Sequence, residues 1–290
     1  MAILRNIQLA TALAAATALA TATAGAEAAP EPDHAPAGYA KVFGDEFDGP
    51  TIDASKWAYD THRNAAGWYN QEKQYYAAAR AENARIENGR LIIEARSETL
   101  DKVRFPDFGG QRFTSTRLFT NGKASWTYGF YEIRAKIPCG RGTWPAIWML
   151  PEDAAVKWPD GGEIDIMEHV GFDPGTVHQT LITRAFNYDS GVQQTKAIKV
   201  ADACTAFHRY QLLWTDKFIV TGIDDEPKFM LKNVKSGRDR WPFDKPMHLL
   251  LNIAVGGTWG GQKGIDPAAF PARMEIDYVR VYQQASGTKK

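Results

Sequence analysis

Short segments of alternating or continuous apolar residues run along most of this chain, and the spacing of an amphipathic helix is scarce. Turn residues separate the segments, as in ENGR, TNGK and GGTWGG. Many short strands joined by such turns predict an all-β sandwich or barrel of antiparallel sheets. Strands do not alternate with helical segments, so a parallel α/β fold is not expected. We expect strands within residues 85–97, 129–137, 145–150, 162–170, 176–183, 208–215, 218–225, 247–256 and 273–283.

The segment GGEIDIMEHVG carries three carboxylates, Glu163, Asp165 and Glu168, in an otherwise apolar and β-branched run. Side chains alternate across a strand, so Glu163 and Asp165 share one face and Glu168 points to the other. A β-bulge at Ile166 or Met167 would add one residue and return Glu168 to the first face. Buried acids are costly without partners or a task. Two carboxylic acids on one bond are what retaining glycoside hydrolysis uses, so the segment predicts a catalytic site. The alternative is a strand with ordinary acids on its solvated face.

The first 28 residues have the order of features of a secretory signal peptide. Arg5 precedes an Ala/Leu/Thr-rich stretch, and small residues offer cleavage after Ala26 or Ala28. The apolar stretch is too short and Ala-rich for a membrane span. We expect a signal peptide over residues 1–28, a Pro/Ala-rich linker over 29–38, one catalytic domain over 39–284 and a flexible tail over 285–290. The protein is then secreted or periplasmic.

Basic and acidic residues balance at 34 each, and the predicted leader removes one of each sign. This balance gives no reason to expect nucleic acid or an anionic membrane as a partner. Nine tryptophans suit an uncharged ligand with apolar faces, such as a neutral sugar. Two cysteines, Cys139 and Cys204, would form a disulfide in an oxidising compartment or remain as two thiols, and no Cys/His spacing suggests zinc.

Aromatic residues gather where a cleft would need them. Trp144 and Trp148 are four apart, so they share a strand face just before the acidic segment, and Trp259 lies among four glycines. Trp57 and Trp214 lie in packed strand patterns and are expected in the core. Three polar residues in or beside strand patterns could hydrogen-bond sugar hydroxyls or be satisfied structural groups: Asn70, Arg117 and His178.

Nearly the whole chain after the leader resembles glycoside hydrolase family 16, and within it the laminarinases, which are endo-β-1,3-glucanases. The resemblance lies in VFGDEFDGPTIDASKW, GWYNQEKQYY, ENARIENGRLIIEAR, the run from FTSTRLF to TWPAIWMLP, GEIDIMEHVG, PFDKPMHLLLNIAVGGTWGG and FPARMEIDYVRVYQ. The Met-containing acidic motif resembles the bulged form of the laminarinases. The resemblance implies a β-jelly-roll sandwich with an open concave cleft, a β-glucan substrate and a monomeric enzyme without a catalytic cofactor.

The resemblance also implies roles for individual residues. Glu163 would be the nucleophile, Glu168 the general acid/base, and Asp165 a hydrogen-bond partner of the nucleophile. Asn70, Arg117, Trp144 and Trp148 match positions that contact glucan. A structural calcium ion on the convex side would take Glu46, the carbonyl of Gly89 and Asp277 as ligands, which are hard oxygen donors of the kind calcium prefers.

The chain departs from the family pattern at two places. Ile182 stands where laminarinases often have a second histidine, in a segment that reads HQTLIT. Tyr69 replaces a small residue and Gln71 an asparagine in GWYNQEKQYY. These changes leave three alternatives open: a mixed-linkage β-1,3-1,4-glucan substrate, another polymer such as agar or carrageenan, and a non-catalytic β-glucan-binding protein.

Overall fold

The computed structural model describes residues 32–285, and its compact folded unit begins at His34. The predicted signal peptide and the last five residues lie outside the described residues, so the proposed domain boundaries stay predictions. Within residues 32–285 the helical elements are two three-residue 3-10 turns, η1 (Tyr69–Gln71) and η2 (Pro267–Ala269). None of the helices in this part of the chain has the length and apolar character to cross a membrane.

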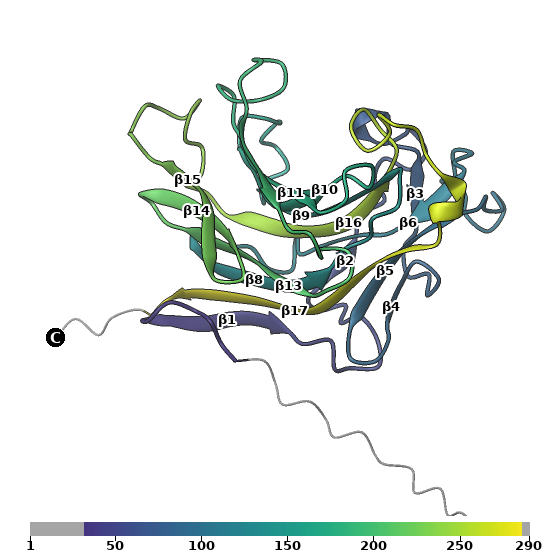
Figure 1. The fold of residues 1–290 in the computed structure, drawn as a ribbon, viewed down its shortest axis with the longest axis horizontal. Coiled ribbons are helices and arrows are strands. Elements are labelled where there is room, and N and C mark those ends of the chain that lie inside the picture. Colours follow the sequence, from purple (N-terminus) through teal and green to yellow (C-terminus); the bar gives the residue numbers. More distant parts are fainter. Residues whose placement is uncertain (1–31, 286–290) are drawn as a thin grey trace, which may run out of the picture. The chain divides into compact units, whose positions relative to one another are not determined.

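One sheet has ten strands (Figure 1). Its long central strand β17 (Ala272–Gln284) pairs with β8, β5 and β1, which makes it the organising strand of the layer. The order along the sheet is β15 (Glu226–Lys232), β14 (Phe218–Ile223), β13 (His208–Trp214), β8 (Gly129–Lys136), β17, β5 (Leu91–Ser97), β6 (Phe113–Ser115) and β3 (Gln74–Tyr76), with β1 (Tyr39–Asp45) on β17 and β4 (Ala84–Ile86) on β5.

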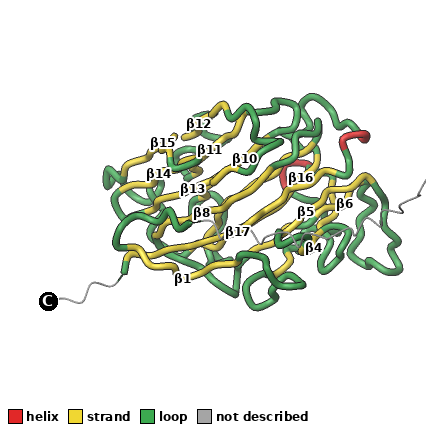
Figure 2. The backbone as a smooth tube through the Cα atoms, turned by 60° about the horizontal axis from the view of Figure 1, so that its bottom comes forward, coloured by secondary structure: helices red, strands yellow, loops and turns green. Residues whose placement is uncertain are grey.

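The second sheet has seven strands and contains the acidic segment as β10. Its order is β12 (Gln194–Lys199), β11 (Thr176–Ile182), β10 (Glu163–His169), β9 (Thr143–Pro151), β16 (Met247–Val255), β7 (Arg117–Phe119) and β2 (Ala58–Tyr59). All of these neighbours pair antiparallel. Figure 2 shows the strands of both sheets running across the molecule.

A continuous apolar core joins the two sheets. The ten-stranded sheet contributes buried residues such as Ile133 and Val281, and the seven-stranded sheet contributes Ile147 and Leu251. Trp57 and Trp214 are both buried in this core, as their strand patterns predict. Because one face of the seven-stranded sheet is committed to the core, its other face is free for polar chemistry.

The predicted fold class, an all-β jelly-roll sandwich, is confirmed, and one detail differs. The pair formed by β3 and β6 is parallel rather than antiparallel. Parallel neighbours need a long crossover connection, and here β4, β5 and the loop after β5 provide it. The turn residues along the chain do not show such a pairing, because it depends on a long connection and not on a hairpin.

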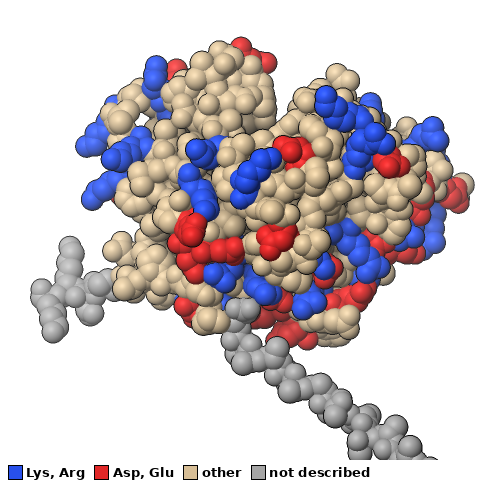
Figure 3. Space-filling model, in the orientation of Figure 1, with Lys and Arg blue, Asp and Glu red and all other residues tan. Residues whose placement is uncertain are grey.

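Loops rise on both sides of the free face of the seven-stranded sheet. Figure 1 shows the loops around residues 152–162 and 183–193 on one side, and the loops around 60–70 and 256–270 on the other. The space-filling view shows the surface hollowed between them (Figure 3). On the face shown there, basic and acidic side chains are interspersed, as the balanced composition predicts.

Candidate active site

A β-bulge in β10 brings the three carboxylates to one face, as predicted. Asp165 pairs with Thr180 of β11 and Glu168 pairs with His178, so two residues of β10 oppose one of β11. Ile166 and Met167, the two residues inside the bulge, are both fully buried in the core. The extra residue therefore corrects the alternation, and Glu168 returns to the face of Glu163 and Asp165.

Gln179, the single residue opposite the bulge, holds it from the core side. Its Nε2 donates to the carbonyl oxygens of Ile166 at 3.1 Å and Gly222 at 3.3 Å. Its Oε1 accepts from Thr221 Oγ1 at 2.7 Å. Gln179 is fully buried, so these bonds satisfy polar atoms that have no access to water. The side chain thus links the bulge to β14 of the other sheet.

The strand register sets a row of functional side chains across the sheet. Glu168 lies opposite His178 on β11 and opposite Ala146 on β9. Ala146 pairs with Asn252 on β16, which pairs with Arg117 on β7. Directly paired residues of antiparallel strands share a face. Five neighbouring strands therefore place a histidine, a carboxylic acid, an amide and a guanidinium in one line.

An aromatic cluster surrounds Glu168. Trp144 is buried, and its Nε1 donates to Glu168 Oε1 at 3.0 Å. The ring of Trp259 meets Trp144 edge to face at 5.4 Å between centroids and meets His178 at 4.9 Å. Trp259 comes from the Gly-rich loop after β16. The rings remove Glu168 from water while leaving one indole N–H as a hydrogen-bond donor.

Arg117 forms the opposite end of the row. It is buried, and its Nε pairs with Asp60 Oδ2 at 2.9 Å. Its guanidinium lies over the ring of Trp148 at 4.6 Å. The Nε1 of Trp148 in turn donates to Asn252 Oδ1 at 2.7 Å. The arginine is thus fixed by an acid and a ring, and its charge favours the anionic form of Glu163.

A loop tryptophan contacts Glu163 directly. Trp158 lies in the loop between β9 and β10, and its Nε1 donates to Glu163 Oε2 at 2.6 Å. Its side chain is 47% exposed, so the ring also presents a face to solvent. The sequence predicts this loop as a wall of the cleft, but the side chain itself was not among the predicted site residues.

The environments of the three acids separate their protonation states. Burial, the charge of Glu163 and the charge of Glu72 raise the pKa of Glu168 to about 8, against the hydrogen bond from Trp144. Burial and the charges of Glu163 and Glu168 raise the pKa of Asp165 well above its usual range. Burial also raises the pKa of Glu163, but hydrogen bonds from Trp158 and Asp165 oppose this. At neutral pH, Glu163 is therefore the carboxyl that ionises most readily, while Glu168 and Asp165 keep their protons.

The other predicted binding residues also lie at this face. Asn70 adopts a positive φ of 56°, and its carbonyl accepts from the backbone N–H of Thr258 at 2.7 Å, which ties η1 to the Gly-rich loop. Its side chain hydrogen-bonds Glu72. The structure therefore gathers all six predicted binding residues around the acids, and their contacts with substrate stay predictions: Asn70, Arg117, Trp144, Trp148, His178 and Trp259.

Both departures from the family pattern border the site. Ile182 is buried and lies directly opposite Glu163 on β11, where an apolar side chain adds to the burial of that carboxyl. Tyr69 is 53% exposed, and the guanidinium of Arg63 lies over its ring at 4.8 Å. A ring held in this way at the rim is available for stacking on a sugar.

Sequence reasoning missed two further residues of the site besides Trp158. Tyr188 is half exposed on the loop between β11 and β12, and after burial the charges of all three acids raise its pKa. Glu72, in the segment GWYNQEKQYY, acts on the charge state of Glu168. A loop tyrosine carries no local signal of this placement, whereas Glu72 stands two residues after the predicted Asn70.

The predicted calcium ligands are engaged in ion pairs. Glu46 pairs with Arg280 at 2.8 Å, and Asp277 pairs with Arg134 at 2.7 Å and Arg90 at 3.4 Å. Guanidinium groups thus occupy the carboxylate oxygens that would bind the ion, and their positive charge disfavours a cation beside them. This donor set does not fit calcium as it stands, so no step of the chemistry is derived through a metal. Calcium at Glu46, Gly89 and Asp277 stays a prediction.

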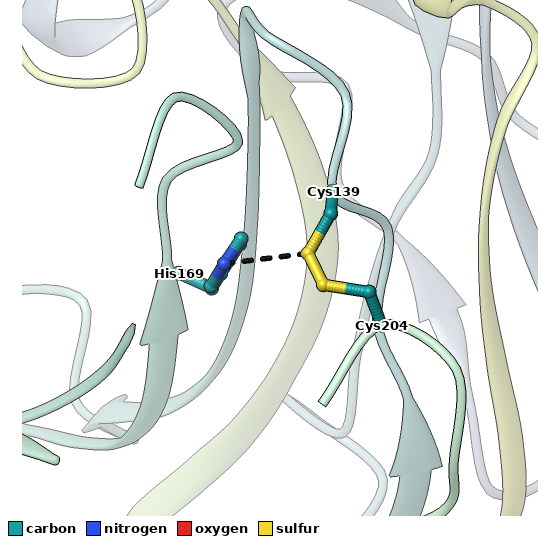
Figure 4. Close-up of side chains that lie close together, drawn as sticks. All are labelled: Cys139, His169 and Cys204. Carbon is teal, nitrogen blue, oxygen red and sulfur yellow. Dashed lines mark hydrogen bonds between the residues drawn. A yellow bond between two sulfur atoms is a disulfide. The ribbon is translucent and has the colours of Figure 1, made fainter. Parts of the chain in front are cut away.

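Cys139 and Cys204 form a disulfide, with Cα atoms 5.6 Å apart (Figure 4). It joins the loop before β9 to the loop after β12. Cys139 Sγ lies 3.5 Å from Nε2 of His169, the residue after Glu168, and both labelled groups face each other in Figure 4. Burial lowers the pKa of His169 to about 4, so the imidazole is neutral. The disulfide therefore anchors the loops at the end of the acidic strand.

A sandwich whose free sheet face carries clustered, partly protonated acids among aromatic rings defines a carbohydrate-active hydrolase. The family model for glycosyl hydrolases family 16 matches residues 71–280, and the chain belongs to this family. It is accordingly a glycoside hydrolase.

Relatives with similar sequences and folds agree. A beta-glucanase of Rhodothermus marinus is 52% identical over 251 residues, which cover 83% of this chain and 84% of the relative. The crystal structure of a mutant of SCLam, a non-specific endo-β-1,3(4)-glucanase, has a TM-score of 0.83 at 50% identity and covers 87% of this chain and 98% of its own. The laminarinase structure from Rhodothermus marinus has a TM-score of 0.79 at 51% identity, with 84% and 97% covered.

Proposed function

We propose that this protein is an endo-β-1,3-glucanase that hydrolyses laminarin-type β-glucan with retention of configuration. The observation that carries the proposal is the bulge in β10, which puts Glu163, Asp165 and Glu168 on one face with separated protonation states. Similar proteins support the substrate class, because SCLam is named a non-specific endo-β-1,3(4)-glucanase and was crystallised with a β-1,3-linked oligosaccharide.

The proposed mechanism is a double displacement. The Glu163 carboxylate attacks the anomeric carbon while Glu168 gives its proton to the leaving glycosidic oxygen, so the C–O bond breaks as the glycosyl–enzyme bond forms. Glu168, now ionised, takes a proton from water as the water attacks the same carbon and releases Glu163. Asp165 donates a hydrogen bond to Glu163 and stabilises its carboxylate as the leaving group of the second step.

The remaining side chains orient the sugar and exclude water. Arg117 supplies a fixed positive charge near Glu163, and Trp158 supplies an N–H to the same carboxylate. The rings of Trp148 and Trp259 offer flat apolar faces for sugar C–H groups. Electrostatic groups that are already oriented before the substrate arrives lower the cost of the transition state.

Product analysis of the purified protein tests the proposal. On laminarin we expect a ladder of short β-1,3 oligosaccharides, with Glu163→Gln and Glu168→Gln each at least about 10²–10⁴-fold slower at an unchanged fold. Azide should restore turnover of Glu163→Gly as a glycosyl azide of inverted configuration. Hydrolysis of laminarin at the parent rate by either Gln variant would contradict the assignment.

A mixed-linkage β-1,3-1,4-glucan is the second candidate substrate, because SCLam is named as acting on both linkages. Barley glucan and agarose belong beside laminarin in the same assay. Cleavage of barley glucan alone would show that Ile182 and Tyr69 redirect specificity. A folded protein that cleaves none of the polymers would instead be a glucan-binding protein, an outcome that the presence of both glutamates disfavours.

We also propose that the enzyme is exported, to the periplasm or the medium, and acts as a monomer. The leader pattern of residues 1–28 and the disulfide both suit an oxidising compartment. N-terminal sequencing of the exported protein should give a first residue at Glu27 or Ala29, and light scattering should give the mass of a single chain.

A further inference from the structure

Glu72 is a fourth carboxylate at the site, and the mechanism above does not use it. It directly follows η1 and bridges to Gly256, the first residue after β16. Gln74 Nε2 donates to Glu72 Oε2 at 2.8 Å, and the side chains of Asn70 and Tyr76 also hydrogen-bond the carboxyl. An acid with three side-chain donors is held in one position, unlike a solvated surface glutamate.

The position of Glu72 is next to the environment of Glu168. A Cβ on Gly257 would lie 3.3 Å from Cγ of Glu72 and 3.4 Å from Cζ3 of Trp144. The absence of a side chain at Gly257 therefore lets Glu72 and Trp144 approach the same small space. Trp144 is the residue that donates to Glu168. Glu72 thus flanks the acid/base through one indole ring.

A hydrogen-bond chain also joins Glu72 to the floor of the site. Asn252 Nδ2 donates to Tyr76 OH at 3.0 Å, and the Tyr76 hydroxyl bonds Glu72. Asn252 Oδ1 accepts from Trp148. Because Tyr76 and Asn252 are buried, this chain is shielded from solvent, where electrostatic effects are stronger than in water.

We propose that Glu72 is a positioning residue for the acid/base: its fixed negative charge beside Trp144 keeps the proton on Glu168 until the leaving oxygen takes it. The inference rests on the proposed function, in which Glu168 is the proton donor. Like charges at short range cannot both ionise easily, so a carboxylate at Glu72 favours neutral Glu168. Burial raises the pKa of Glu72 itself, whereas Gln74, Arg117, Asn70 and Tyr76 favour its charged form.

Other charged or titratable groups also face Glu168 and have to be held constant. Glu163 and Asp165 come from the same strand, His178 from β11 and Tyr188 from the loop after it. Arg117, on β7, acts on both Glu163 and Glu72. A substitution that changes only Glu72 leaves all of these in place, which makes it the informative variant.

The test is the pH profile of kcat/KM on laminarin for Glu72→Gln. Removing the negative charge makes ionised Glu168 easier to form, so the alkaline limb should move to lower pH by about 0.5–1 unit. Above this limb the variant should lose about 3–10-fold more of its rate than the parent. Glu72→Asp, which keeps the charge, should restore the parent profile, and Glu72→Ala covers the case in which the amide does not fold.

Two further measurements separate this inference from the proposed function. An aryl β-glucoside with a dinitrophenol leaving group needs no proton in the first step, so Glu72→Gln should leave its glycosylation rate within about twofold of the parent. In Glu168→Gln the alkaline limb on laminarin should disappear, and its persistence would refute the role of Glu168. If the limb does belong to Glu168 but Glu72→Gln lowers activity without moving it, Glu72 is merely structural and this inference alone is overturned.

Discussion

Trp158 donates its indole N–H to Glu163 across 2.6 Å, so a loop residue controls the carboxylate at the first position of β10. Half of that tryptophan is exposed, and the other half seals Glu163 from one side. A charge-assisted hydrogen bond of this length favours the ionised acid, which is the form that attacks.

Replacing this donor tests its contribution. In Trp158→Phe the ring remains and the N–H is lost, so the pKa of Glu163 should rise because one of the interactions that lowers it is gone. We expect the acid limb of kcat/KM to move to higher pH and the rate at pH 6 to fall about 10-fold, the equivalent of about 1.4 kcal/mol. Tyr188→Phe is the control, since no hydrogen bond from its hydroxyl to an acid is involved. An unmoved acid limb in Trp158→Phe would contradict the role of the indole.

The bulge depends on Gln179, and this dependence can be measured. Gln179→Met keeps the length of the side chain but leaves the carbonyls of Ile166 and Gly222 without their donor. Unsatisfied buried groups cost about 1–3 kcal/mol each, so unfolding free energy should fall by at least about 2 kcal/mol in denaturant titration. Activity should fall with it because Glu168 leaves its alignment. Gln194→Met, on neighbouring β12, should change stability by less than about 0.5 kcal/mol.

Stability should depend on pH through Glu168. Its folded pKa of about 8 lies above the unfolded value of about 4.3, so the native protein keeps a proton that the unfolded chain releases. This contribution is fully present below the lower value and is lost as pH rises toward 8. Glu168→Gln stays neutral and avoids the loss.

Calorimetry therefore should show Glu168→Gln melting higher than the parent at pH 8, by about 2–4 °C for each 1 kcal/mol, with a smaller difference at pH 5. The control Glu87→Gln removes an acid whose pKa the hydrogen bond from Arg85 lowers, and no gain is expected there. A Glu168→Gln variant that melts below the parent at pH 8 would show that the acid is not buried against its charged form.

The disulfide closes a loop of 65 residues. Constraining a loop of that size stabilises a fold by about 2–4 kcal/mol, so Cys139→Ser with Cys204→Ser should lower Tm by roughly 5–10 °C. At 25 °C the rate on laminarin should change less than the stability, because the bridge anchors loops and does not itself take part in the chemistry. An unchanged Tm would mean that the neighbouring strands alone hold these two loops.

Calcium sensitivity is a direct test of the ion pairs at Glu46 and Asp277. Since Arg280 and Arg134 already neutralise these carboxylates, we expect Tm to stay within about 1 °C between EDTA and millimolar calcium. A rise of Tm with calcium concentration would show that the ion displaces the arginines and would restore the predicted site. Asp277→Asn would then abolish that rise.

The local pattern of the chain determines much of this protein. Alternation and turn residues predict the strands, the parity of Glu163, Asp165 and Glu168 predicts the bulge, and the four-residue spacing of Trp144 and Trp148 predicts a shared face. These features follow from the two-residue period of a strand, which is a property of neighbouring residues and needs no tertiary contact.

Only the tertiary structure decided which distant residues complete the site. Trp158, Tyr188 and Glu72 come from loops whose paths are set by long-range strand order, so nothing in their own segments places them beside the acids. The protonation states also depend on burial by the opposite sheet and on charges from several strands, which act through space. Similarly, a sequence offers Glu46 and Asp277 as metal ligands, but only packing shows that arginines reach them first.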